Sequence, residues 1–245
     1  MENFRKIALG LILLFAVIAG IRVYLIHQER EEANAPASDS RPTTHTTDDD
    51  LVIPRQIYPS TMKDAKALIG TTVWVSAGGQ IEVYPYTSGS VQFAHSAGYL
   101  LGADELHVKD FVLATASKDS ALRIPRGNKQ VFMIFTRPGD DAKEFAAPVG
   151  YIDNTGYTFY LDTLFFYDDV HVLYKHWPKP IWDAVTRHEA ILGMNERQVM
   201  MALGQVQASG STDQGNRTVK YYNLGKPVSV TFENDKATNI QATQF

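Results

Sequence analysis

Carboxylate and imidazole side chains gather in the segment FYDDVHVLYKHW, which contains Asp168, Asp169, His171 and His176. Such groups together could hold zinc, manganese or iron and serve a metal-dependent hydrolase. On a β-strand Asp169 and His171 would point to one side and His176 to the other, so convergence on one ion requires a turn. The spacing matches no standard metal site. We therefore favour the interpretation that Asp168 and Asp169 end a hairpin and that the two histidines are half-exposed strand residues.

The remaining sequence contains no motif for a familiar catalytic mechanism. Arg187-His188-Glu189 resembles the start of a zinc-protease helix, but Leu192 stands where the second histidine ligand belongs. The patterns of a nucleophile elbow, a phosphate loop and a dinucleotide-binding loop do not occur. The sequence thus predicts no catalytic residue and no cofactor.

Composition excludes several further classes. The absence of cysteine rules out disulfides, thiol catalysis, zinc-cysteine sites, iron–sulfur clusters and a lipidated N-terminal cysteine. The net charge is -4, and the 23 lysines and arginines are dispersed. Because phosphate-binding surfaces need clustered basic residues, we expect no nucleic-acid partner.

The N-terminus predicts a membrane location. Residues 7–26, IALGLILLFAVIAGIRVYLI, are apolar apart from Arg22, and Arg5 and Lys6 precede them. This length is close to the roughly 20 residues that cross a bilayer, and the preceding basic residues favour a cytoplasmic N-terminus. We expect residues 1–27 to form a single-pass anchor in the cytoplasmic membrane, with the rest in the periplasm or extracytoplasmic space. The alternatives are a signal peptide cleaved near Ala19 and, less favoured, a buried core helix.

Residues 28–50 are predicted to form a disordered tether. Their only apolar residues are three alanines, so they bury too little surface to offset the entropy of ordering. A flexible coil of this length would let the folded part move roughly 25 to 30 Å from the membrane. We interpret the run Asp48-Asp49-Asp50 as solvated, because three successive residues in a coil do not converge on one cation.

Residues 51–177 are predicted to form an antiparallel β-rich domain. A short helix should follow Ser60, and residues 71–75 and 80–86 should form a hairpin through the turn residues 77–79. Further strands separated by turn-forming clusters are expected at 105–116, 121–125, 130–137, 144–152 and 157–167. Many short strands without intervening helices favour a barrel or sandwich.

Side-chain alternation in this region suggests a core and a surface. Val73 and Val75 would face the same interior as Ile81 and Val83. Aromatic residues on the strands would either fill the core or form a surface for a wall glycan or a protein partner. These candidates are Trp74, Tyr84, Tyr86, Tyr157, Phe159, Tyr160, Phe165, Phe166 and Tyr167. Residues 99–112 resemble the start of small bacterial β-barrels of the Src-homology type, which implies a binding or spacing module.

Residues 178–245 are predicted to form an α+β module of two helices and a three-stranded meander. The first helix covers 181–191 and enters through Pro180. In the second, Asn195 caps the first turn and Gln198 completes a capping box, whereas Gly204 ends the helix in a left-handed conformation. Strands are expected at 218–225, 227–235 and 236–244, after a polar loop at 207–217.

This module resembles the BamE-like (SmpA/OmlA) family of envelope proteins. The resemblance rests on a helix motif and on two later segments, Tyr221-Tyr222 and Val228–Phe232. The motif residues are Gly193, Met194, Asn195, Gln198, Val199, Ala202, Leu203 and Gly204. Asn195 replaces the usual Ser or Thr and Val206 the usual proline. The family's namesake is a lipoprotein of the outer-membrane assembly machine, whereas this chain has no cysteine to lipidate.

Together these features predict a mainly β protein with an α+β C-terminal module, anchored in the cytoplasmic membrane. We expect a non-enzymatic cell-envelope protein whose exported modules bind protein partners in envelope assembly or maintenance. The alternatives are a metal-dependent envelope hydrolase that uses the Asp168/Asp169/His171 cluster, and a wall-glycan-binding protein.

Overall fold

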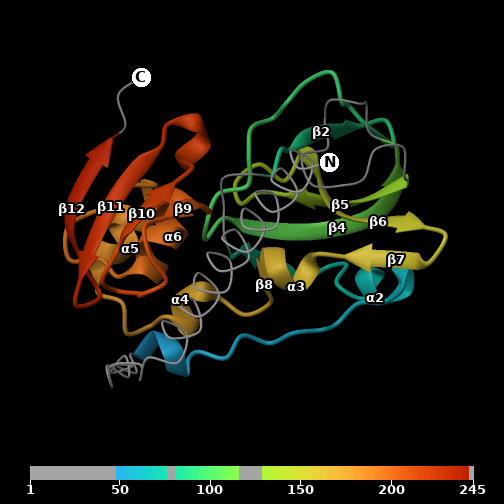
Figure 1. Ribbon diagram of the computed structural model, residues 1–245. Helices are drawn as coiled ribbons and strands as arrows, with labels where there is room; N and C mark the ends of the chain where they lie inside the picture. The colour runs from blue at the N-terminus through green and yellow to red at the C-terminus, as the bar shows by residue number, and fades with distance from the viewer. Residues whose placement is uncertain (1–47, 77–80, 116–128, 243–245) are drawn as a thin grey trace, which may run out of the picture. The chain divides into compact units, whose positions relative to one another are not determined.

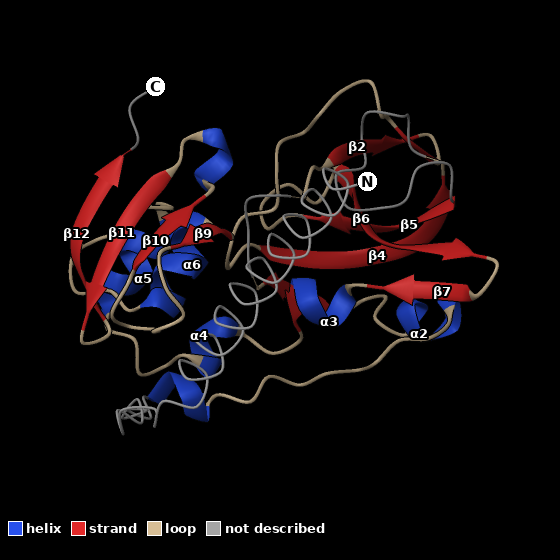
Figure 2. Ribbon diagram, in the orientation of Figure 1, coloured by secondary structure: helices blue, strands red, loops and turns tan. Residues whose placement is uncertain are grey.

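The structure is a computed structural model that describes residues 48–76, 81–115 and 129–242. In this part the chain is mainly β, with two antiparallel sheets and several short helices (Figures 1 and 2). The predicted fold class is confirmed at this level. The apolar segment 7–26 lies outside the described residues, and within them no helix has the length and hydropathy needed to cross a bilayer.

The first sheet is built from the region predicted to be β-rich. Its strands are β1 (Thr72–Val75), β2 (Tyr84–Thr87), β3 (Ser90–Val91), β4 (Glu105–Ala114), β5 (Lys129–Thr136), β6 (Glu144–Asp153), β7 (Gly156–Phe159) and β8 (Phe165–Phe166). They lie in the order β3-β2-β6-β5-β4-β1-β8, and β7 also pairs with β6. Among the described strands no pairing joins β3 to β8, so hydrogen bonds do not close this sheet into a barrel.

The predicted hairpin between residues 71–75 and 80–86 is wrong. β1 instead pairs with β4, where Val73 lies opposite Leu106, and with β8, where Trp74 lies opposite Phe166. β2 pairs with β3 and β6. The turn residues indicate only that the chain changes direction, whereas the pairing edge depends on strands distant in sequence.

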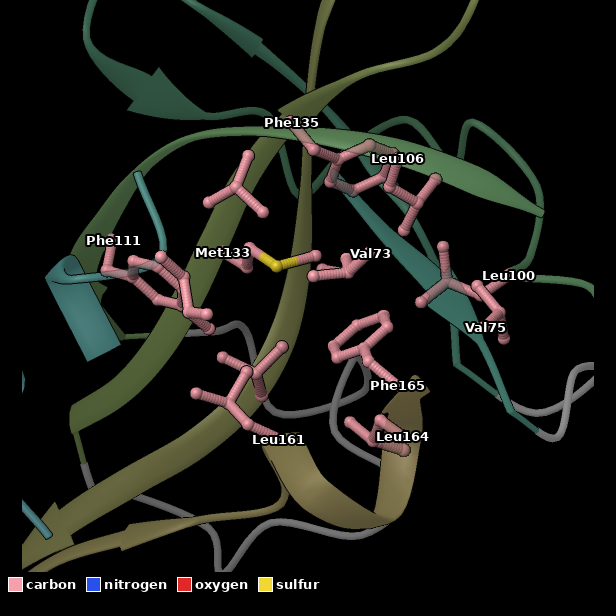
Figure 3. Packing of buried hydrophobic residues seen from close by; sticks show 14 of the residues in the cluster. Val73, Val75, Leu100, Leu106, Phe111, Met133, Phe135, Leu161, Leu164 and Phe165 are labelled. Atoms are coloured by element: carbon pink, nitrogen blue, oxygen red, sulfur yellow. The ribbon is translucent and has the colours of Figure 1, made fainter. Parts of the chain in front are cut away.

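The interior predicted from alternation is confirmed. Val73 and Val75 belong to one buried cluster with Ile81 and Val83. Figure 3 shows Val73 beside Met133, with side chains from α3 (Leu161–Leu164) and β8 on the other side of the same core.

β5 is the central strand of the sheet, and it is buried from Gln130 to Thr136. Val131, Met133 and Phe135 belong to the main core. Phe132 and Ile134 belong to a small separate cluster with Tyr84 and Val91. Apolar side chains therefore cover both faces, which explains why the sequence of β5 is continuously apolar rather than alternating.

The segment predicted as a strand at 157–167 is interrupted by helix α3, which separates β7 from β8. Another short helix, α4 (Val170–Leu173), follows, and the Asp169 carboxylate caps it by accepting the backbone N–H of His171. Asp168 and Asp169 therefore do not end a hairpin, and His171 is a helical residue. Asp favours such N-cap positions because its side chain satisfies a free N–H.

Two other helices begin within two residues of their predicted starts but are shorter than predicted. α2 (Met62–Lys66) has a capping box between Thr61 and Asp64, one residue later than the predicted cap at Ser60. α5 (Lys179–Thr186) contains Pro180 in its first turn, as predicted, but ends before residue 191.

The C-terminal sheet has four strands rather than the predicted three. β10 (Thr218–Tyr221), β11 (Val228–Glu233) and β12 (Lys236–Ala242) form the expected meander, with the short helix η2 (Asn223–Gly225) between β10 and β11. The additional edge strand, β9 (Val206–Ser209), pairs with β10. All four of its residues are exposed, so its sequence lacks the alternation that would have revealed it.

The second large core crosses the predicted domain boundary at residue 177. Phe166, Val170, Tyr174 and Trp177 pack with the buried residues of α5, α6 (Glu196–Leu203) and the C-terminal sheet. These residues were assigned to the β-rich domain by sequence. Because they are buried together with residues of α5 and α6, they belong to the core of the C-terminal module.

Candidate functional site at the N-terminal strap

The described chain begins with a strap, residues 48–58, which runs alongside residues 162–177 (Figure 1). It opens with the 3-10 helix η1 (Asp48–Leu51). The predicted tether at 28–50 therefore extends too far, since Asp48, Asp49 and Asp50 belong to η1, while residues 28–47 lie outside the described residues. The strap makes three groups of polar contacts with the rest of the described chain, which we call the body: Asp49 with His176, Trp177 and Asn195, Arg55 with residues 167–168, and residues 57–58 with Asp162.

Asp49 provides the first and most buried of these contacts. It is only 4% exposed, and its carboxylate accepts hydrogen bonds from His176 Nε2 at 2.5 Å, Trp177 Nε1 at 2.6 Å and Asn195 Nδ2 at 2.7 Å. The interpretation of Asp49 as a solvated charge is wrong. A buried carboxylate needs such partners because the loss of hydration is otherwise costly. We call Asp49 and these three donors the latch.

Aromatic rings pack around Trp177, one of the latch residues. The rings of Tyr174 and Trp177 stack with centroids 4.5 Å apart, and Trp177 and Trp182 are 5.1 Å apart. His171 packs on Trp182 with centroids 4.3 Å apart. Burial raises the pKa of Tyr174. This packing fixes Trp177, so its indole N–H is held ready for the Asp49 carboxylate.

The second and third contacts hold the middle and end of the strap. Arg55 donates to the backbone carbonyl of Tyr167 at 3.1 Å and lies over the Tyr167 ring. The Asp162 carboxylate accepts the backbone N–H groups of Ile57 and Tyr58 at 3.0 and 2.8 Å. The hydroxyl of Tyr167 also donates to Asp162 at 2.8 Å, and burial raises the pKa of that hydroxyl.

The four residues proposed as metal ligands take part in separate interactions. Asp168 lies 4.0 Å from Arg55, Asp169 pairs with His171 at 3.0 Å, and His176 bonds to Asp49. In the described ranges no group of three or more histidine, aspartate or glutamate side chains is placed to hold a metal ion. The residues thus serve helix capping and strap attachment.

The aromatic residues considered for glycan binding are all at least partly buried. Tyr84, Phe165, Phe166 and Tyr167 are buried, and the other five are partly buried. Tyr157 and Phe159 stack with centroids 5.7 Å apart and pack on the main core. These residues mainly fill and protect the cores.

Most motif residues in and beside α6 have the structural roles predicted for them, and Gly204 departs in its backbone conformation. Asn195 and Gln198 form the capping box, Met194 and Val199 are buried, and Gly204 has the positive φ of 89° expected at the helix end. Its ψ of -152° is extended rather than left-handed helical, and β9 begins two residues later. Gly193 also has a positive φ, and Leu203 is buried.

Asn195 has a second role, which uses the side-chain amide N–H that serine and threonine lack. Its Oδ1 accepts the N–H of Gln198, whereas its Nδ2 donates to Asp49. The residue therefore links the cap of α6 to the latch. The sequence reveals the cap, but the contact with a residue 146 positions away is visible only in the structure.

We expect Asn195→Ser to preserve the cap but remove the bond to Asp49, lowering the free energy of unfolding by roughly 1.5 kcal/mol. Asn195→Ala should lose both bonds and cost roughly 1 kcal/mol more. Urea unfolding of both variants measures the two steps. Equal stability of the serine variant and the unmodified protein would show that the Asp49 bond contributes nothing.

A second group of titratable side chains lies at Asp104, Arg137 and His188. All three are partly buried, and both Arg137 Nε and His188 Nδ1 are buried without a hydrogen-bond partner among the residues that the structure describes. Burial raises the pKa of Asp104, although a hydrogen bond from Leu101 and the charges of Arg137 and His188 oppose this. No local sequence pattern predicts this group, because its members come from three loops that are distant in sequence.

The raised pKa of Asp104 predicts a pH dependence. Ionisation of Asp104 destabilises the folded state. This loss of stability is absent at pH values below the pKa of Asp104 in the unfolded state, and it grows as the pH rises through the higher pKa in the folded state. Asp104→Asn keeps an acceptor for Leu101, and its stability gain over the unmodified protein should increase across that window. Each pKa unit corresponds to about 1.4 kcal/mol in urea unfolding. Asp153→Asn should show the opposite slope, because hydrogen bonds from Thr155 lower that pKa.

A buried ion pair, which the sequence analysis did not predict, fixes the loop before β10. Arg217 binds Glu196 through Nε at 3.0 Å and Nη2 at 2.7 Å, and the N–H of Gly215 donates to the same carboxylate at 2.7 Å. The hydrogen bond to Glu196 raises the pKa of Arg217. Burial raises the pKa of Tyr221, whose hydroxyl donates to the Glu196 carbonyl.

Comparison with known proteins gave no match: no family model, curated protein or solved structure is significantly similar to this chain. The geometry of the described residues is therefore the basis for a functional proposal.

Proposed function

We propose that this protein is a non-enzymatic, membrane-anchored protein of the cell envelope that presents its folded part to a protein partner. The latch is the observation that carries the proposal. It joins the start of the described chain to the C-terminal module through one buried carboxylate, that of Asp49, which lies 23 positions after the end of the apolar segment 7–26. Such an attachment would fix the point at which the chain from the proposed anchor joins the folded part.

The C-terminal module is the part that we propose as BamE-like. Two helices followed by an antiparallel sheet, with a capping box at Asn195, agree with the sequence resemblance. The side chains with ligand chemistry in residues 166–177 are engaged in internal contacts, so we favour partner binding over hydrolysis for this region.

Membrane fractionation of cells that produce the full chain tests the anchor. We expect the protein to stay in the membrane after alkaline carbonate extraction and to be digested by protease added outside the cytoplasmic membrane. Intact mass of the purified chain distinguishes a retained anchor from a cleaved signal peptide. Recovery in the cytosol would refute the proposal.

Crosslinking followed by affinity purification tests the partner. We expect a specific envelope protein to be recovered with the unmodified chain under stringent washing. Recovery of no envelope protein from crosslinked membranes would contradict partner binding while leaving the anchor unaffected.

A further inference from the structure

The strap and the helix beside it expose an unusual amount of aliphatic surface. Leu51 is 69%, Ile53 88% and Val172 of α4 65% exposed, and Tyr58 further along the strap is 78% exposed. Single exposed apolar residues are ordinary, but these are four of the most exposed large hydrophobic residues in the described ranges. We call Leu51, Ile53, Val172 and Tyr58 the strap face.

The local backbone explains why Leu51 and Ile53 point outward. Val52, between them, is partly buried and packs against the second core. Ile53 follows Val52 in a segment without helix, where an extended chain alternates its side chains and turns Ile53 away from the core, whereas Leu51 is the exposed last residue of η1. Contacts of Asp49 with His176 and of Arg55 with Tyr167 place this part of the strap alongside α4, which carries Val172.

From these observations we propose that the strap face rests in the interfacial layer of the bilayer that holds the anchor. This inference rests on the proposed function. The polypeptide between the anchor and the strap, residues 28–47, has only alanines as apolar residues and so offers no cover. Twenty residues of chain can reach at most roughly 70 Å, so a bilayer that holds the anchor lies within reach of the strap.

The chemistry of the strap face fits a lipid interface. Aliphatic side chains enter the boundary between headgroups and acyl chains, and tyrosine favours the same depth because its ring is apolar and its hydroxyl polar. Asp48 and Lys175 are both exposed near the latch, so the surroundings have mixed charge. Apolar contact should therefore dominate, and binding should occur on neutral lipid.

The absence of cysteine permits a direct test. Ile53→Cys and Val172→Cys in the full chain, each labelled with the environment-sensitive dye NBD, are reconstituted into phosphatidylcholine vesicles. Asn239→Cys, at an exposed position of β12, is the matched control. We expect a blue shift, a several-fold gain in emission and quenching by spin-labelled lipid at 53 and 172, but not at 239.

The outcomes separate this inference from the proposed function. Emission at 53 and 172 equal to that at 239, in vesicles where the chain resists carbonate extraction, would overturn membrane contact but leave the anchor intact. A blue shift that appears only when membrane proteins are added would indicate a protein occupant and would also overturn it. Equal quenching at all three positions would show that no particular face is preferred, again contrary to the proposal.

Discussion

Asp49→Ala should lower the free energy of unfolding by about 3 kcal/mol and release the strap. The substitution leaves the donors of His176, Trp177 and Asn195 without their shared acceptor. Buried donors without a partner are costly, but the strap can detach and admit water, which limits the loss. The variant should therefore keep both sheets while the first part of the strap becomes mobile.

Urea unfolding and limited trypsin digestion measure these two effects. We expect faster cleavage after Arg55 in Asp49→Ala than in the unmodified protein, because protease attacks backbone that detaches locally. Asp48→Ala is the matched control, since Asp48 is exposed and the substitution should change stability by no more than about 0.5 kcal/mol. If both variants behave alike, the latch does not hold the strap.

Glu196→Ala should destabilise the protein by about 3 kcal/mol. The Glu196 side chain is 7% and the Arg217 side chain 18% exposed, so removing the carboxylate leaves a largely buried guanidinium without its counter-ion. The Gly215 N–H loses its acceptor as well. Glu196 also lies in the first turn of α6, where a negative charge is favourable.

The exposed pair of Arg187 and Glu189 provides the control for burial. Their side chains are 55% and 60% exposed, so Glu189→Ala should cost less than about 1 kcal/mol. The double substitution Glu196→Met with Arg217→Met should recover much of the stability in urea unfolding, because neither charge then remains unpaired. A double variant less stable than Glu196→Ala would argue against the unpaired-charge explanation.

Local signals in the sequence determined the starts of α5 and α6 and the buried faces of strands. Asn195 with Gln198 specifies the start of α6, and Pro180 marks the first turn of α5. Alternation assigned Val73 and Val75 to the correct interior. These features depend on side chains within a few residues of one another, so neighbouring residue types suffice to predict them.

Signals of the same kind failed where a residue could satisfy more than one local pattern. Asp169 suits a hairpin end and a helix N-cap equally well, and packing of Val170 into the second core selects the helix. β9 has no buried side to mark it, so its pairing with β10 alone makes it a strand.

The sequence by itself determined a mainly β chain with capped helices near its C-terminus, because hydrophobic periodicity and capping are local. Only the tertiary structure decided that Asp49 is a buried acceptor, that β1 pairs with β4 and β8, and that Glu196 binds Arg217. From the sequence alone, a charged residue is expected to be solvated. The partners of Asp49 lie more than a hundred positions away in the sequence, and only folding brings them next to its carboxylate.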